Sequence, residues 1–289
     1  MIKKINYADS VWKDIIEQYF PQFLEFFYKN IYQDIDFKKG YEFLDKEFQQ
    51  IVKDNEIGNR YADKLVKVWL KDGSEKWLLI HVEVQGSVEK NFSERLYIYN
   101  YRIFDKYKKE VISLAILTDE NKKFRPEKYE IKRWGFHCLY KFPIIKIIDY
   151  KSKLNELEKS LNPFSIAVCT HLRLIEARDD YNMKYFWKLH LVKAMYKKGY
   201  KKPDILNLYR FIDWLIILNK NLEIKFKNEL IKFEEEKKMP YITNIEKLAA
   251  EKIAQNMISK GMDKKTIAEL TGLSEKEINK LAKNSKKAA

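Results

Sequence analysis

The sequence predicts an α/β domain, in which helices flank a mixed sheet, followed by an α-helical half and a tail like a helix-turn-helix. Strand-like segments surround one helical pattern between residues 61 and 118. From Pro163 onward the apolar period becomes 3.6 and stays so, which is typical of amphipathic helices. Residues 261–278 then carry the turn and cap residues of two short helices. We therefore expect units at residues 1–150, 151–240 and 241–289.

The composition is that of a folded, basic protein. Of 289 residues, 46% are hydrophobic, which excludes an intrinsically disordered chain, and the net charge is +14. That charge favours a polyanionic partner such as nucleic acid, although a lysine-rich composition alone also produces it. Two cysteines argue for a reducing compartment rather than a disulfide framework. The apolar runs are too short to cross a bilayer, so we expect a cytoplasmic protein with no membrane partner.

The N-terminal segments are predicted to be helical. Residues 8–32 are rich in aromatic side chains and are expected to be helical around Pro21. Residues 35–52 are predicted to form a further helix because apolar side chains recur there at helical intervals, at Phe43, Leu44, Phe48, Ile51 and Val52. Glu47 borders this apolar stripe and either faces solvent or reaches into a nearby site.

Two strands joined by a tight turn come next. Residues 61–70 and 77–85 alternate in side-chain type, and the Asp-Gly pair at residues 72–73 suits a hairpin turn because it tolerates positive φ. The two strands are therefore predicted to pair antiparallel. One face of the second strand is apolar, and the other carries His81, Glu83 and Gln85.

The following segments continue the α/β pattern. A helix over residues 92–107, with Ser93 or Asn91 as its N-cap, leads to an apolar strand over residues 111–118 that is predicted to be buried on both faces. Residues 136–149 are predicted to hold one more strand, broken at Pro143. The helical half is then expected in four segments, at residues 163–178, 181–198, 204–220 and 222–238.

The register of the hairpin decides whether two carboxylates meet. A two-residue loop, residues 72–73, pairs Asp63 with Val82, whereas a three-residue loop, residues 72–74, pairs Asp63 with Glu83. The apolar pattern favours the second register, because Asp63 and Glu83 then lie together on the face opposite the apolar side chains.

Neighbouring carboxylates repel each other unless a cation lies between them. Their oxygens suit Mg²⁺ or Mn²⁺, ions that leave further coordination positions to water and phosphate. Asp63 and Glu83 are therefore predicted to bind a metal that serves phosphodiester hydrolysis. Gln85 is predicted to orient the attacking water, and Glu47 is a candidate outer ligand. His81 shares the face but is expected to be a structural residue.

These motifs resemble the PD-(D/E)XK nuclease superfamily and, within it, the recombination-promoting nuclease and transposase branch. The resemblance rests on the Asp63 strand, on Glu83-Val84-Gln85, and on three further segments: Leu44-Asp45-Lys46-Glu47, Arg95–Arg102 and Phe211-Ile212-Asp213-Trp214-Leu215. It covers about residues 8–220, and Thr271-Gly272-Leu273-Ser274 is also similar to the branch. It implies a restriction-endonuclease-like mixed sheet in residues 1–150.

The resemblance implies a Mg²⁺-dependent DNA endonuclease of bacterial mobile-element type, with Asp63 and Glu83 as metal ligands and Glu47 as the helix carboxylate. Gln85 stands where the superfamily has a lysine, so the positive charge near the scissile phosphate must come from elsewhere or be absent. Arg95 and Arg102, on the helix that follows, are candidates for that charge and for DNA phosphate contacts, or are simply solvated. Ala62 replaces the usual proline, which matters little.

Other functional classes stay open. Gln85 favours a catalytically silent DNA-binding or assembly protein that retains the nuclease fold, and a protein-interacting accessory factor is a third class. Cutting both strands with one site per chain would favour a homodimer.

The tail carries the residue pattern of an αα-hairpin. One helix is expected to end at Thr271, Gly272 to turn the chain, and Ser274 to cap the next helix with Glu277 at the reciprocal position. Residues 258–289 contain eight lysines and four acidic residues, so this unit is a candidate reader of DNA. A hairpin that only contacts a partner is the favoured interpretation, because the second helix is short and has few base-reading side chains.

Overall fold

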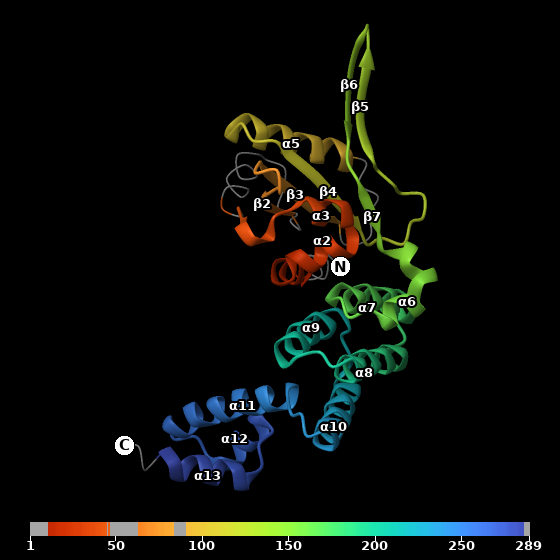
Figure 1. Cartoon of the computed structure of the whole chain (residues 1–289). Coiled ribbons are helices and arrows are strands. Elements are labelled where there is room, and N and C mark those ends of the chain that lie inside the picture. Colours follow the sequence, from red (N-terminus) through yellow and green to blue (C-terminus); the bar gives the residue numbers. More distant parts are fainter. Residues whose placement is uncertain (1–10, 45, 47–62, 84–90, 286–289) are drawn as a thin grey trace. The chain divides into compact units, whose positions relative to one another are not determined.

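The computed structural model describes residues 11–44, 46, 63–83 and 91–285 (Figure 1). The chain forms two compact units, of which one comprises Met1–Leu191 with Arg210–Ile217 and the other Val192–Tyr209 with Leu218–Ala289. The first unit contains the sheet, and the second contains the C-terminal helices. The boundaries predicted near residues 150 and 240 stay predictions.

A mixed five-stranded sheet forms the centre of the first unit, as predicted. Its strand order is β1-β2-β3-β4-β7, and the bounds are Tyr41–Phe43, Asp63–Trp69, Glu75–Glu83, Val111–Leu117 and Ile144–Lys146. Neighbours β1, β2 and β3 pair antiparallel, whereas β3, β4 and β7 pair parallel. A parallel pair needs a crossover connection, and helix α5 (Phe92–Tyr107) supplies it between β3 and β4.

Strand β1 corrects the first part of the helix predicted over residues 35–52. Residues 35–44 contain a short 3₁₀ turn, Phe37–Lys39, and then β1, whose Tyr41 pairs with Val68 of β2. Lys46 is helical, and the rest of the predicted helix lies outside the described residues. Gly40 precedes the strand with φ 78°, a conformation that ends the local helical path. The Tyr41 and Phe43 rings, two residues apart on one face of the strand, both pack on Phe20. Sheet pairing and ring packing therefore decide the conformation here, because the helical spacing of apolar residues extends over too few residues to predict it.

The β2–β3 hairpin also differs from prediction, by two residues of register. Asp63 pairs with His81, not with Glu83. The loop has three residues, as expected, but it comprises residues 71–73, because the Leu70 amide donates to the Ser74 carbonyl (2.8 Å). This choice gives Gly73, with φ 89°, the last loop position, at which a three-residue hairpin loop needs a left-handed residue. A shift of two residues keeps each side chain on its predicted face.

Helices cover both faces of the sheet (Figure 1). The face that carries Leu65, Trp77 and Leu117 packs against the buried side of α5, which comprises Phe92, Leu96, Tyr99 and Ile103. On the opposite face Lys64 of β2 forms an ion pair (2.6 Å) with Glu17, which belongs to a helical segment over residues 11–18. Helices α2 (Phe20–Phe27) and α3 (Lys29–Asp34) follow that segment, so the predicted N-terminal helices are confirmed where they are described.

A second hairpin, β5–β6, interrupts the chain between β4 and β7. Its strands, Lys128–Arg133 and Phe136–Lys141, form a separate two-stranded sheet. The single strand predicted over residues 136–149 is in fact β6 and β7, which Pro143 separates. Strand β5 was not predicted, because its only apolar residues, Tyr129 and Ile131, are too few to show a period of two.

The helical half follows the predicted segments closely. After a 3₁₀ stretch (Ile147–Lys153), the helices α6 to α10 are Leu154–Lys159, Pro163–Ala177, Tyr181–Lys197, Lys202–Leu215 and Lys220–Lys237. In the described part of the chain, no helix combines the length and the apolarity that a membrane span requires.

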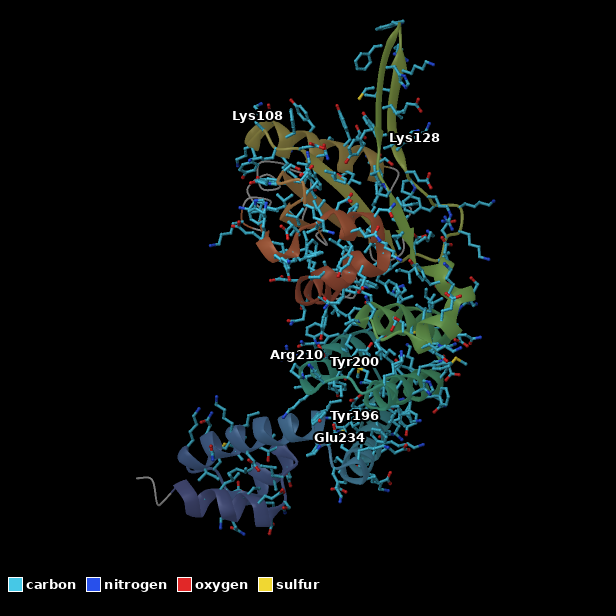
Figure 2. All side chains as sticks on the ribbon, in the orientation of Figure 1. Lys108, Lys128, Tyr196, Tyr200, Arg210 and Glu234 are labelled. Carbon is cyan, nitrogen blue, oxygen red and sulfur yellow. The ribbon has the colours of Figure 1, made fainter. Side chains whose placement is uncertain are left out.

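Within the second unit a buried carboxylate joins α10 to the next helix, α11 (Ile242–Ser259). Glu234 accepts hydrogen bonds from the backbone amides of Ile242 (2.8 Å) and Thr243 (3.0 Å), and therefore caps the start of α11. It also accepts from the hydroxyls of Thr243 and Tyr196, the latter on α8 (Figure 2).

The predicted hairpin of the tail is confirmed. Helix α12 (Lys264–Thr271) ends at Gly272, which has φ 71°, and α13 is Glu275–Ser285. The Ser274 amide donates to the Glu277 carboxylate (3.0 Å), as a capping box requires. A small apolar core holds the three helices together and consists of Ala254, Ile267, Leu273 and Ile278.

Candidate active site

The candidate site lies at one edge of the five-stranded sheet. Strands β3, β4 and β7 run parallel and reach this edge with Glu83, Leu117 and Lys146. Strand β2 runs the other way and starts there with Asp63. Carboxyl ends of parallel strands are where open α/β sheets bind their ligands. The edge therefore collects two predicted acidic residues and, unexpectedly, a lysine.

The register places Asp63 and Glu83 on the same face of neighbouring strands. Because Asp63 pairs with His81, Glu83 is its diagonal neighbour, a position typically about 7–8 Å away between Cα atoms. Two carboxyl side chains can converge on one small cation from such positions, and an all-oxygen donor pair fits Mg²⁺ or Mn²⁺. Gln85 and Glu47, the other two predicted catalytic residues, lie outside the described residues.

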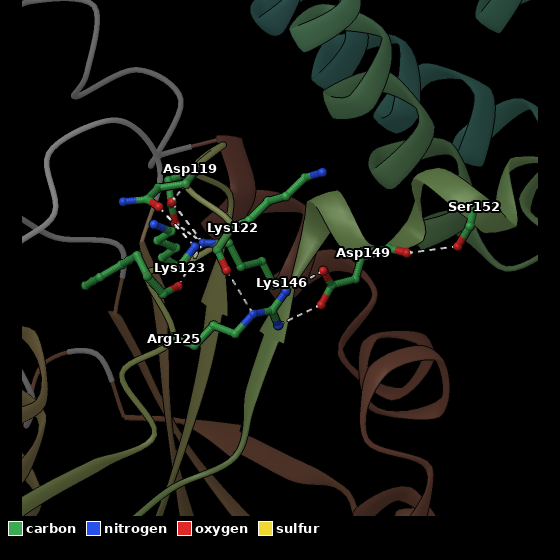
Figure 3. Close-up of polar contacts among 9 residues, drawn as sticks. Asp119, Lys122, Lys123, Arg125, Lys146, Asp149 and Ser152 are labelled. Carbon is green, nitrogen blue, oxygen red and sulfur yellow. Dashed lines mark hydrogen bonds and ion pairs between the residues drawn. The ribbon is translucent and has the colours of Figure 1, made fainter.

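A buried ion pair occupies the same edge two strands away from Glu83 (Figure 3). Lys146 pairs in register with Leu117, and its ammonium group contacts both carboxylate oxygens of Asp119 (2.8 and 2.7 Å) and the carbonyl of Phe124 (2.9 Å). The Lys146 side chain has no exposed surface. Its three N–H donors are therefore matched by three acceptors, and its charge is balanced where it lies.

The ends of β4 and β7 are fixed by two further contacts. Beyond β4, the Thr118 carbonyl accepts a hydrogen bond from Nε2 of His171 on α7 (2.9 Å). Burial lowers the pKa of His171 from its ordinary value of 6.5, so the ring is neutral at pH 7. Beyond β7, Asp149 accepts two hydrogen bonds from Arg125 (2.8 and 2.6 Å), and this guanidinium group lowers the pKa of Asp149. These contacts join the segment that follows β4 to α7, and the segment that follows β7 to Arg125.

Helix α5 brings one of the two predicted arginines near this edge. Its first residue, Phe92, packs on Phe124 and Phe142, whereas its last residue, Tyr107, packs on Trp77 at the start of the parallel strands. Arg95 is therefore in the first turn of α5, the turn nearest this edge, and is half-buried beside the Phe92 ring. Arg102 lies seven residues further on, which is about 10 Å along the helix away from that edge.

Asp119, Lys146 and His171 were not predicted as residues of this edge. Lys146 could have been recognised, because it is a lysine in the middle of the apolar run Ile144–Ile148. A charge buried there requires a partner. Its partner could not be identified from the sequence, since Asp119 is 27 residues away.

The comparisons with known proteins agree with the resemblance inferred from the motifs. Residues 247–283 match the family model described as Rpn/YhgA-like nuclease family, C-terminal HTH domain. The matched segment contains α12 and most of α11 and α13, so the tail is a helix-turn-helix domain similar to the C-terminal domain of that family. Neither the curated proteins nor the solved structures gave a significant match. The family match supports a nuclease-type function and DNA binding.

Proposed function

We propose that the protein is a divalent-metal-dependent DNA endonuclease of the recombination-promoting nuclease and transposase type. The observation that carries this proposal is the register of β2 and β3, in which positions 63 and 83 are diagonal neighbours on one face of the sheet, at the carboxyl edge of β3, β4 and β7. The helix-turn-helix domain of a nuclease family in the same chain supports it.

Each residue has a distinct task in this proposal. Asp63 and Glu83 hold Mg²⁺ or Mn²⁺, and Gln85 orients the attacking water, with Glu47 as an outer carboxylate. The bound metal would supply charge neutralisation at the scissile phosphate and a more acidic water. Arg95 provides a positive charge beside the phosphate, because Lys146 is already balanced by Asp119. Arg102 contacts the DNA backbone further along.

The test is cleavage of supercoiled plasmid DNA with Mg²⁺ or Mn²⁺. Asp63→Asn and Glu83→Gln are expected to lower the rate about a hundredfold or more, the equivalent of several kcal/mol of lost stabilisation. Glu75→Gln is the matched control, because Glu75 lies on the same strand and face as Glu83 but at the opposite end, where Lys109 pairs with it (3.0 Å). Equal cleavage by all four proteins would refute the site.

Metal binding gives a second readout that does not depend on activity. Calorimetric titration of Mn²⁺ into the parent protein should give a binding signal that Asp63→Asn and Glu83→Gln remove and Glu75→Gln retains. A homodimer is part of the proposal only for cleavage of both strands, and sedimentation of the DNA-bound protein would show it.

A catalytically silent DNA-binding protein is the second candidate. The specific observation in its favour is that position 85 is a glutamine while the buried Lys146 is fully engaged by Asp119 and Phe124. This candidate predicts DNA affinity that falls with salt, no cleavage with either metal, and unchanged binding in Glu83→Gln.

A further inference from the structure

The β5–β6 hairpin is an arm that projects from the sheet unit (Figure 1). Its base is anchored firmly, because Tyr129 and Tyr140 pack on the Tyr97 ring of α5 with centroid distances of 4.9 and 5.5 Å. Phe142, just beyond the hairpin, is buried in the core beneath α5. Toward the tip every residue from Ile131 to His137 is exposed. The arm therefore has a rigid base and a tip that contributes nothing to the core.

The turn at the tip contains a residue type that is unusual for its backbone conformation. Arg133 pairs with Phe136, so Trp134 and Gly135 form a two-residue loop, and both have positive φ (52° and 84°). Turns of this kind strongly prefer Asn-Gly or Asp-Gly. Tryptophan at positive φ is strained, and here the residue is 95% exposed, so burial in the core does not compensate for the strain. A residue that strains the backbone and does not pack in the core does not stabilise the fold, so its position indicates a role in binding.

Charge around the tip identifies the class of partner. The hairpin has four basic residues against one acidic residue, Glu130, and Glu130 is already paired with Lys128 (2.5 Å) and His137 (2.9 Å). The basic residues are Lys128, Lys132, Arg133 and Lys141. The Arg133 guanidinium lies over the Trp134 ring at 5.3 Å, and Phe136 beside them is also exposed. Aromatic rings flanked by cations, with no free acid, match a polyanion that has planar faces.

We propose that the β5–β6 hairpin is a DNA-binding arm whose Trp134 stacks on a base of duplex DNA while Lys132 and Arg133 contact the flanking phosphates. A two-stranded ribbon fits a DNA groove, and apolar side chains that enter a groove act as wedges between base steps. The inference rests on the proposed function in one respect only, that DNA is the substrate.

Binding is measured apart from cleavage, so that the two proposals can fail separately. The parent for this test is the full chain carrying Asp63→Asn, without added metal, and the probe is a fluorescein-labelled 30-base-pair duplex followed by anisotropy. Trp134→Asn removes the ring and gives the turn its preferred Asn-Gly sequence, so the hairpin is retained. Phe104→Ala is the matched control, since Phe104 is an exposed aromatic residue of the same unit on α5.

Trp134→Asn is expected to weaken duplex binding about tenfold, the usual effect of losing one stacked aromatic ring, while Phe104→Ala changes it less than about twofold. Replacing Lys132 and Arg133 by glutamine should reduce the slope of log affinity against log salt by about two. A 2-aminopurine placed in the duplex should brighten with the parent and stay dim with Trp134→Asn, because stacking on Trp134 opens the base step.

Contrary outcomes separate the two proposals. If the parent binds DNA and Trp134→Asn binds equally well, the arm is not a DNA contact, whatever the nuclease does. If Trp134→Asn instead lowers the sedimenting mass with DNA affinity unchanged, the tip contacts a second copy of the chain, and the inference is overturned. A parent that does not bind duplex DNA at all contradicts the proposed function as well as the arm.

Discussion

The sheet unit contains two β-hairpins that use their residues in opposite ways. The β2–β3 hairpin has a turn with a glycine in the required position, and its strands carry buried side chains such as Leu65, Val66 and Leu78. The β5–β6 hairpin has a strained turn at Trp134 and strands that are almost wholly exposed. One hairpin is part of the core, and the other is attached to it.

The two hairpins can hold functional residues in different places. In β2–β3 the core takes up Leu65, Val66, Val68, Trp77 and Leu78, and the two predicted metal ligands, Asp63 and Glu83, stand at the strand ends. In β5–β6 every residue from Ile131 to His137 is exposed, so the composition of the tip is free to match a partner. Variants that affect stability should therefore cluster in the first hairpin and its sheet, and variants that affect binding in the second.

The largest effect on stability is expected at Lys146, close to the second hairpin in sequence but part of the buried sheet. Lys146→Met leaves Asp119 without its partner, and breaking a buried ion pair typically costs about 3–5 kcal/mol. Lys141→Met, in the exposed hairpin, is the control and should change the free energy of unfolding by less than about 0.5 kcal/mol. Urea denaturation measures both. Similar values for the two variants would remove the distinction between core and arm.

A smaller effect should depend on pH, through His171 behind β4. Its folded pKa lies below 6.5, so the unfolded chain binds the proton more readily in that range. The stability due to the neutral ring is fully present above about pH 6.5 and is lost as pH falls toward the folded pKa, by about 1.4 kcal/mol per unit of depression. Denaturation between pH 5 and 8 should show this slope, and His171→Gln should flatten it. A slope unchanged in the variant would assign it to other groups.

The turn of the first hairpin should tolerate substitution less well than the tip of the second. Gly73→Ala puts a side chain at φ 89°, which costs about 1–2 kcal/mol even though nothing lies near the added Cβ. Lys71→Arg is the control, because it changes another loop residue and keeps a cationic donor for the Gln33 carbonyl. Thermal unfolding checks the prediction, and a Gly73→Ala protein as stable as the parent would show that the turn is not strained by a side chain.

The smallest effect on stability is expected for Trp134→Asn. Asparagine suits positive φ better than tryptophan, so the free energy of unfolding should stay unchanged or rise by up to about 1 kcal/mol. Thermal unfolding of this variant beside Gly73→Ala makes the comparison direct. If Trp134→Asn were less stable than Gly73→Ala, Trp134 would have a packing role, contrary to what its exposure indicates.

Periodicity identified the elements that have a long, strong pattern. Helix α5 begins and ends at the predicted residues, and strands β2, β3 and β4 and the C-terminal helices lie where they were expected. Strand β1 could not be recognised, because three residues are too few to show a period of two and Phe43 and Leu44 also fit a helical spacing. Strand β5 was missed for the same reason, since only Tyr129 and Ile131 alternate among charged residues there.

For the candidate site, the sequence predicted which face of the sheet carries Asp63 and Glu83, but not which residues pair across the strands. Side-chain alternation assigned Asp63 and Glu83 to one face, and that assignment does not change when the register shifts by two residues. The exact partner depended on which loop residue takes positive φ, and Gly73 in the last loop position decides it. Asp119 and Lys146 meet only through the order of β4 and β7 in the sheet, which no local pattern encodes.

The capping of α11 by Glu234 limits how the helix-turn-helix domain can be exchanged between proteins. The composition changes at Met239-Pro240, and a graft made there would separate Glu234 from the amides of Ile242 and Thr243. Glu234 is fully buried and stays with the N-terminal part of the chain. A new C-terminal domain without matching hydrogen-bond donors would therefore leave its carboxylate oxygens unsatisfied. Recombination of this domain in evolution, or its transplantation in the laboratory, would therefore have to carry α10 along with it.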